Sequence, residues 1–277
     1  MDTPAVRTAL IMGVVNVTPD SFSDGGLFLD ADAAVRHGLR LVDEGADILD
    51  VGGESTRPGA EPVSAEDERQ RVLPVVERLA QDAGARISID TSKLAVARAA
   101  LDAGATLVND VSAFRFDPGM AALVAETGAG CCLMHMLGEP RTMQQDPRYD
   151  DVVSDVKAFL EERLALAVSE GIDEERVWLD PGIGFGKTVE HNLELLRRLD
   201  EIVALGRPVV VGTSRKSFLG KLAGGRGEGE RLPGTIATNV LALERGAKVF
   251  RVHVVAQNVD ALAVAAATVR TDVGERS

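Results

Sequence analysis

Residues 45–53 read GADILDVGG, and this stretch decides the fold. A Gly-Ala pair precedes a short apolar run, the pattern expected where a helix ends in a left-handed glycine cap and a strand begins. A glycine stands in the same place before six further apolar runs, at Gly84, Gly104, Gly128, Gly171, Gly206 and Gly246. The chain is therefore predicted to pass from helix to strand at regular intervals.

With the first run included, the sequence contains eight candidate strands: ALIMGVV, DILDVG, RISID, TLVNDV, GCCLMH, VWLD, PVVVG and KVFRVHVV. Most of them lack the apolar–polar alternation of half-exposed sheets, which indicates parallel strands covered by helices. Amphipathic segments lie between them, and Val35, Leu39 and Val42, for example, are spaced by four and three. Helices and strands are thus expected to alternate.

This alternation predicts an α/β fold, a (β/α)8 TIM barrel in which residues 1–277 form a single domain. Such barrels typically need roughly 250 residues, and the chain has 277. A doubly wound open sheet is the alternative architecture. Eight regular units without a separate crossover region favour the barrel.

The composition excludes several classes of protein. No apolar run approaches the ~20 residues that span a bilayer, and the first residues, MDTPAVRTALIMG, do not resemble a secretory signal, so a cytoplasmic location is expected. A net charge of −13 disfavours binding to nucleic acid or to an anionic membrane. Cys131 and Cys132 are adjacent within an apolar run, which predicts buried, reduced thiols.

Polar residues end or closely follow each of the eight expected strands. In a barrel these positions form the functional face. They are Asn16, Glu54, Asp90, Asn109, His135, Asp180, Ser214, Arg215, Lys216, Arg251 and His253. For any one of them, capping or a hydrogen bond at the barrel end is an equal explanation, but their recurrence on one rim favours a site. The cations after the last two strands lie where barrels often bind phosphate, which indicates a small anionic substrate.

Other sites are weighed against this one. The run GIGFGKT resembles a P-loop, but Pro181 occupies the position of its first glycine. Lys187 could form a Schiff base, yet that chemistry needs a desolvated amine, and a glycine-rich loop favours ordinary loop contacts instead. The four histidines are dispersed, which argues against a tight zinc site.

Read together, the rim segments NVTPDSFSDGG, DVGGESTRPGA, SIDTSK, NDVS, DPGIGFGKT, GTSRKSFLG and RVH closely resemble the dihydropteroate synthase family. The similarity runs from Ile11 to Val254 in the right order. It implies a barrel transferase of folate biosynthesis. Such an enzyme joins 6-hydroxymethyl-7,8-dihydropterin diphosphate to 4-aminobenzoate and releases diphosphate and 7,8-dihydropteroate. The resemblance also implies Mg²⁺ as cofactor and a homodimer.

The resemblance assigns the pterin site. Asp90, Asn109 and Asp180 would line a deep pocket, and Lys216 would reach the ring. A carboxylate can accept both the amino group and the neighbouring ring N–H of a pterin, which suits Asp180. Asn16 would contact the Mg²⁺ that accompanies the diphosphate, since an oxygen ligand suits that cation.

The resemblance also assigns the other substrate groups. Arg251 and His253, with Thr56 and Arg57, would bind the diphosphate, and Lys216, Arg251 and His253 are the expected catalytic residues. Phe22, Pro58 and Ser217 would frame 4-aminobenzoate. The implied reaction is a dissociative substitution, in which the pterin methylene–oxygen bond breaks before the arylamine arrives.

One position departs from the family, which commonly reads RVHDV where this chain has Val254. An acidic side chain there could orient His253, so its absence bears on diphosphate binding. Two alternatives remain. One is a barrel that takes methyltetrahydrofolate and transfers its methyl group, which would share the pterin aspartates and asparagine; the other is a non-catalytic paralogue that only binds pterin, which Val254 alone supports.

Overall fold

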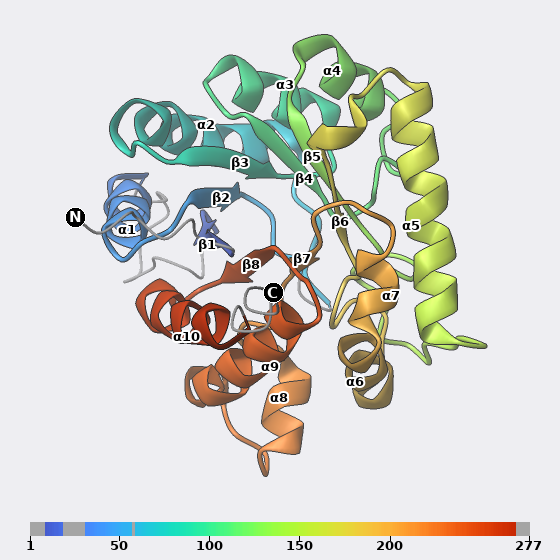
Figure 1. Cartoon of the computed structure of the whole chain (residues 1–277). Helices are drawn as coiled ribbons and strands as arrows, with labels where there is room; N and C mark the ends of the chain where they lie inside the picture. Colours follow the sequence, from blue (N-terminus) through green and yellow to red (C-terminus); the bar gives the residue numbers. More distant parts are fainter. Residues whose placement is uncertain (1–8, 19–30, 57–58, 270–277) are drawn as a thin grey trace, which may run out of the picture.

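The computed structural model describes residues 9–18, 31–56 and 59–269. Its strands are β1 (Leu10–Asn16), β2 (Ile48–Gly52), β3 (Arg86–Asp90), β4 (Leu107–Asp110), β5 (Gly130–Met134), β6 (Val177–Asp180), β7 (Val210–Val211) and β8 (Val249–Val252). They form one parallel sheet in the order β6-β5-β4-β3-β2-β1-β8-β7. A single parallel bridge between Leu179 and Val209 joins the two outer strands and closes the ring. The predicted barrel is confirmed (Figure 1).

Helices surround the sheet in Figure 1. They are α1 (Ala31–Asp43), α2 (Ala65–Asp82), α3 (Leu94–Asp102), α4 (Met120–Thr127), α5 (Val152–Ser169), α6 (Val189–Arg197), α7 (Leu199–Val203), α8 (Ser217–Leu222), α9 (Leu232–Glu244) and α10 (Val255–Val269), with 3₁₀ turns at Glu174–Arg176 and Glu228–Glu230. Within the described ranges, none of these helices has the length and apolar character to cross a bilayer.

The interior of the barrel is layered. Near the strand starts, a buried apolar cluster fills it, made of Met12, Ile48, Leu107, Cys132, Trp178, Val210 and Val249. Side chains two residues apart on a strand point the same way. On four of these strands the next inward position is polar, and Asp50, Asn109, Asp180 and Arg251 follow Ile48, Leu107, Trp178 and Val249. An apolar floor thus lies beneath a charged layer at the carboxyl ends of the strands.

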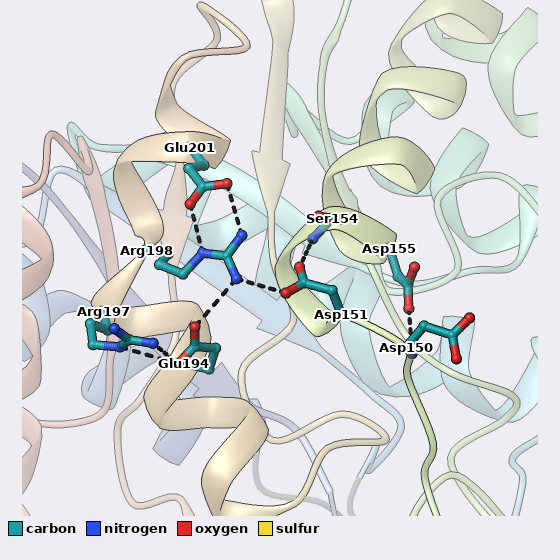
Figure 2. A network of polar contacts seen from close by, with 8 residues as sticks. All are labelled: Asp150, Asp151, Ser154, Asp155, Glu194, Arg197, Arg198 and Glu201. Carbon is teal, nitrogen blue, oxygen red and sulfur yellow. Dashed lines mark hydrogen bonds and ion pairs between the residues drawn. The ribbon is translucent and has the colours of Figure 1, made fainter.

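An ion-pair network braces the helices on one side of the barrel (Figure 2). The Arg198 guanidinium, between α6 and α7, donates to Asp151 at 2.8 Å, to Glu201 at 2.6 Å and to Glu194 at 3.3 Å. Asp151 also caps α5 by accepting from the Ser154 amide at 2.7 Å. The network ties the start of α5 to the junction between α6 and α7.

Candidate active site

The centre of the polar layer is an ion-pair cluster around Arg251. Its Nε donates to Asp50 Oδ2 at 2.6 Å, and its Nη2 donates to Asp90 Oδ2 at 2.7 Å. The same Asp50 oxygen accepts from Asn109 Nδ2 at 3.0 Å. The structure therefore brings Asp90, Asn109 and Arg251 together, as expected from the sequence. Asp50 completes the cluster and was not among the predicted site residues.

Two buried carboxyl groups of the site hold their protons more tightly than usual. Burial raises the pKa of Asp90 to about 7, partly offset by the nearby Arg251 cation. Burial likewise raises the pKa of Asp180 to about 6, although the Gly182 amide, which donates to Oδ1 at 2.7 Å, and the Lys216 and Arg251 charges oppose it. Desolvation disfavours the carboxylate, so both groups titrate close to neutral pH.

The loop between β6 and α6, residues 181–188, places Asp180 against Lys216. Gly182 has φ +66°, and a Cβ there would lie 1.8 Å from the His135 carbonyl oxygen, so only glycine fits. The Phe185 ring of this loop lies 3.9 Å from Lys216 Nζ, a cation–π contact. The glycine-rich run thus acts as a close-packed support for the pocket.

Lys187 lies beneath this loop rather than on its surface. It is only 3% exposed, and its ammonium contacts His135 Nδ1 at 2.9 Å and donates to the Phe185 carbonyl at 3.0 Å. Burial lowers its pKa to about 7. Lys187 does make loop contacts, as predicted. The amine is nevertheless desolvated, contrary to the expectation for a glycine-rich loop, because the loop folds inward and buries it.

Three further contacts fix the same loop from outside. Gln144 donates to the Gly184 carbonyl at 2.8 Å, and the Tyr149 hydroxyl donates to the Gly186 carbonyl at 2.8 Å. The Gly184 amide donates to Asn192 Oδ1 at 2.7 Å. The segment before α5 and helix α6 therefore both hold the loop that follows Asp180.

His253 has a partner that the sequence did not indicate. Its Nδ1 lies 3.0 Å from the Ser214 hydroxyl, which also accepts from the His253 backbone amide at 3.2 Å. The Val254 carbonyl accepts from Asn258 Nδ2 at 2.7 Å in the first turn of α10. Ser214 thus orients the His253 imidazole. This is the role that an acidic side chain at position 254 could have had.

The other predicted residues fall at the same end of the barrel or outside the described residues. Asn16 is the last residue of β1, and Ser217 is the first of α8. Thr56 is half-buried in the segment after β2. Phe22, Arg57 and Pro58 lie outside the described residues. In the described part of the chain, no three His, Cys, Asp or Glu side chains gather into a metal site.

Comparison with known proteins shows the family. A family model for pterin binding enzymes matches residues 12–253, and dihydropteroate synthase of Escherichia coli K12 is 47% identical over 266 residues, 96% of this chain and 94% of that protein. The chain belongs to the dihydropteroate synthase family of pterin-binding enzymes.

Solved structures of the dihydropteroate synthase family have the same fold. Xanthomonas albilineans dihydropteroate synthase with 4-aminobenzoic acid has a TM-score of 0.89 at 49% identity, covering 95% of this chain and 94% of that chain. The same enzyme in complex with 7,8-dihydropteroate has a TM-score of 0.86 at 46% identity, with coverage of 95% and 94%. The predicted family and transferase class are confirmed.

Proposed function

We propose that this barrel condenses 6-hydroxymethyl-7,8-dihydropterin diphosphate with 4-aminobenzoate to 7,8-dihydropteroate, with release of diphosphate. The observation that carries the proposal is the set of the buried Asn109 and Asp180 and the largely buried Asp90 beside Arg251, at the carboxyl ends of the strands of a dihydropteroate synthase barrel. Relatives of this chain are solved with 4-aminobenzoic acid and with 7,8-dihydropteroate, one substrate and the product of this reaction.

The acceptors of the site suit the pterin ring. The Gly182 amide takes one acceptor site on Oδ1 of Asp180, which leaves the other lone pairs of Oδ1 and Oδ2 to accept from the amino group and ring N–H of the pterin edge. Lys216, fixed over Phe185, lies near enough to Asp180 to lower its pKa, so it reaches the same ring. A substrate without such donors would bind poorly, because the buried carboxylate would lose its hydrogen bonds to water without gaining new ones.

The donors of the site suit the diphosphate. Arg251 and His253 lie on and just after β8, and a charge-assisted bond from Arg251 and a hydrogen bond from His253 stabilise the leaving group most as its charge develops. The 4-aminobenzoate amine is neutral at pH 7, so the reaction needs no strong general base. Water must be kept from the pterin methylene until the amine arrives.

The residues present fit Mg²⁺ bound together with the substrate. Asn16 ends β1 half-buried, and its side chain makes no hydrogen bond to another described residue, so its amide oxygen can ligate the ion. Since the described residues offer no carboxylate cage, diphosphate oxygens and water would supply the other ligands. When bound, Mg²⁺ would neutralise charge on the departing diphosphate.

The test is product formation by the purified chain with both substrates and Mg²⁺. We expect diphosphate and dihydropteroate in equal amounts, and no dihydropteroate without 4-aminobenzoate. Lys216→Ala should lose the activity, whereas Lys221→Ala, which removes an exposed lysine from α8, should keep it. Binding of the pterin diphosphate without any product would support the paralogue instead. Chelation with EDTA tests the Mg²⁺ requirement.

We also propose a cytoplasmic homodimer, on the resemblance alone. Sedimentation velocity of the purified chain distinguishes a dimer of about twice 29.3 kDa from a monomer. A single species at the monomer mass across micromolar concentrations would contradict the dimer.

A further inference from the structure

Asp50 is a fully buried carboxylate with an unusual set of partners. It lies on β2 inside the barrel, and one of its oxygens, Oδ2, accepts from both Asn109 and Arg251 at 3.0 and 2.6 Å. Its other oxygen, Oδ1, is also buried and has no hydrogen-bond partner among the described residues. A buried charge is costly unless it is paired, so its partners decide whether Asp50 is tolerated.

Asp50 fixes which end of the Asn109 amide faces the substrate. An ionised carboxylate only accepts hydrogen bonds, so the group of Asn109 that faces it must be the NH₂. The Asn109 carbonyl oxygen is then turned away from Asp50. Asn109 therefore offers an acceptor to the pocket, and a bound ring must supply the donor.

Asp50 also fixes the Arg251 guanidinium. Nε is held by Asp50 from β2 and Nη2 by Asp90 from β3, while Nη1 has no partner among the residues that the structure describes. The side chain remains 22% exposed. Two carboxylates on neighbouring strands thus clamp two nitrogens of the guanidinium and leave the third as a donor for the substrate.

We propose that Asp50 is a positioning residue, which sets Asn109 to accept from and Arg251 to donate to the bound pterin diphosphate. This inference rests on the proposed function and adds to it the residue that fixes the hydrogen-bonding pattern of the pterin site. Asp50 itself need not touch the substrate. Its effect reaches the substrate through the two side chains that it holds.

The charges around Asp90 support this role. The groups that act on Asp90 are Arg251 from β8, Asp50 from β2, Glu68 from α2 and Asp110 from β4. The Asp50 carboxylate raises the pKa of Asp90 by repulsion, and Arg251 lowers it. If Asp50 loses its charge, its repulsion of the Asp90 carboxylate is removed, so the pKa of Asp90 should fall.

The experiment compares Asp50→Asn and Asp50→Ala with Ser88→Ala. Ser88 is the β3 residue paired with Asp50 across the sheet, and it is fully buried with a hydroxyl that has no partner among the described residues. Ser88→Ala therefore controls for a change of side chain in the same layer. Each variant is measured for KM of both substrates, for pterin diphosphate binding without 4-aminobenzoate, and for its pH profile, with circular dichroism as the check on folding.

We expect Asp50→Asn to raise KM and Kd for the pterin diphosphate about tenfold, the loss of one charge-assisted bond, with KM for 4-aminobenzoate unchanged. Asp50→Ala should lose more, because it also removes the acceptor for Asn109. The acidic limb of the pH profile should move to lower pH in Asp50→Asn, and Ser88→Ala should match the wild type.

Two results would overturn the inference. One is a folded Asp50→Asn with wild-type KM, Kd and pH profile, and the other is an equal rise in KM for both substrates. Failure of the proposed function is a different outcome, since the wild-type chain itself would then form no dihydropteroate. If Asp50→Ala does not fold, Asp50→Asn alone decides.

Discussion

Replacing Asp180 by asparagine should change how the stability of the fold depends on pH. The folded-state pKa of Asp180 is about 6, raised from an ordinary 3.8 mainly by burial. A carboxyl whose pKa is raised on folding favours the folded state while it is protonated. Its contribution is therefore largest below pH 3.8 and is lost as the pH rises towards 6. Asparagine keeps an oxygen for the Gly182 amide but cannot ionise.

The size of the effect follows from the shift. Above about pH 7 the wild type has lost about 3 kcal/mol of unfolding free energy, which corresponds to the full difference of about two units between the folded and unfolded pKa of Asp180. At pH 5 only the part of this difference between pH 3.8 and pH 5 has been lost, about 2 kcal/mol. The stability of Asp180→Asn relative to the wild type should therefore increase by about 1 kcal/mol between pH 5 and pH 8.

The assay is urea unfolding of both proteins at pH 5, 6.5 and 8, with binding of the pterin diphosphate measured on the same samples. We expect Asp180→Asn to gain stability relative to the wild type as the pH rises, while losing the pterin. The reasoning fails if the difference in unfolding free energy is flat across this range, because Asp180 would then titrate alike in the folded and unfolded chains. The pH dependence is the test, since asparagine also changes the stability by an amount that does not vary with pH.

Three further substitutions test the site and its supports. Arg251→Ala should reduce kcat/KM by at least about 10²-fold in steady-state assays, because it removes a cation of the pocket. Circular dichroism checks that the variant is folded at the assay temperature, since the change also leaves the buried Asp50 without its cation partner. Lys187→Met should raise the pH at which pterin binding is half-maximal, since loss of the nearby cation raises the pKa of Asp180. Binding titrations at several pH values measure this midpoint, and an unchanged midpoint would contradict the prediction. Arg198→Ala should lower Tm at low salt, with a smaller difference at roughly 1 M NaCl, where surface ion pairs are screened, as measured by thermal melts.

The sequence predicted the barrel because glycine caps and short apolar runs are local signals, and each of the eight runs coincides with an observed strand, apart from Asn16, which extends β1 by one residue. Only two residues of PVVVG, Val210 and Val211, form β7, while Val209 makes a single bridge to Leu179. The predicted cysteine environment is confirmed, with both thiols buried and their pKa values raised.

The sequence was less informative about the inside of the barrel. Asp50 resembles any acidic residue of a strand, and only the closed ring shows that it faces Arg251 across the interior, 201 positions away in the chain. Lys187 was misjudged for a related reason, because the inward path of its loop depends on contacts with His135 and with the segment before α5. The contact between Ser214 and His253 depends on the pairing of β7 with β8, which the local sequence does not indicate.

The weakest join of the barrel has a consequence for the dynamics of the enzyme. Only one bridge connects β6 to the start of β7, whereas β5 and β6 share four paired positions. Asp180 ends β6 and Lys216 follows β7, so these side chains stand on opposite sides of the join. A pterin ring bound by both Asp180 and Lys216 would link β6 to the segment after β7. The bound substrate would then stabilise the barrel where its strand pairing is weakest. Amide hydrogen exchange at Val210 and Val211 should then slow more on ligand binding than exchange in β3 and β4, where the ladder is already continuous.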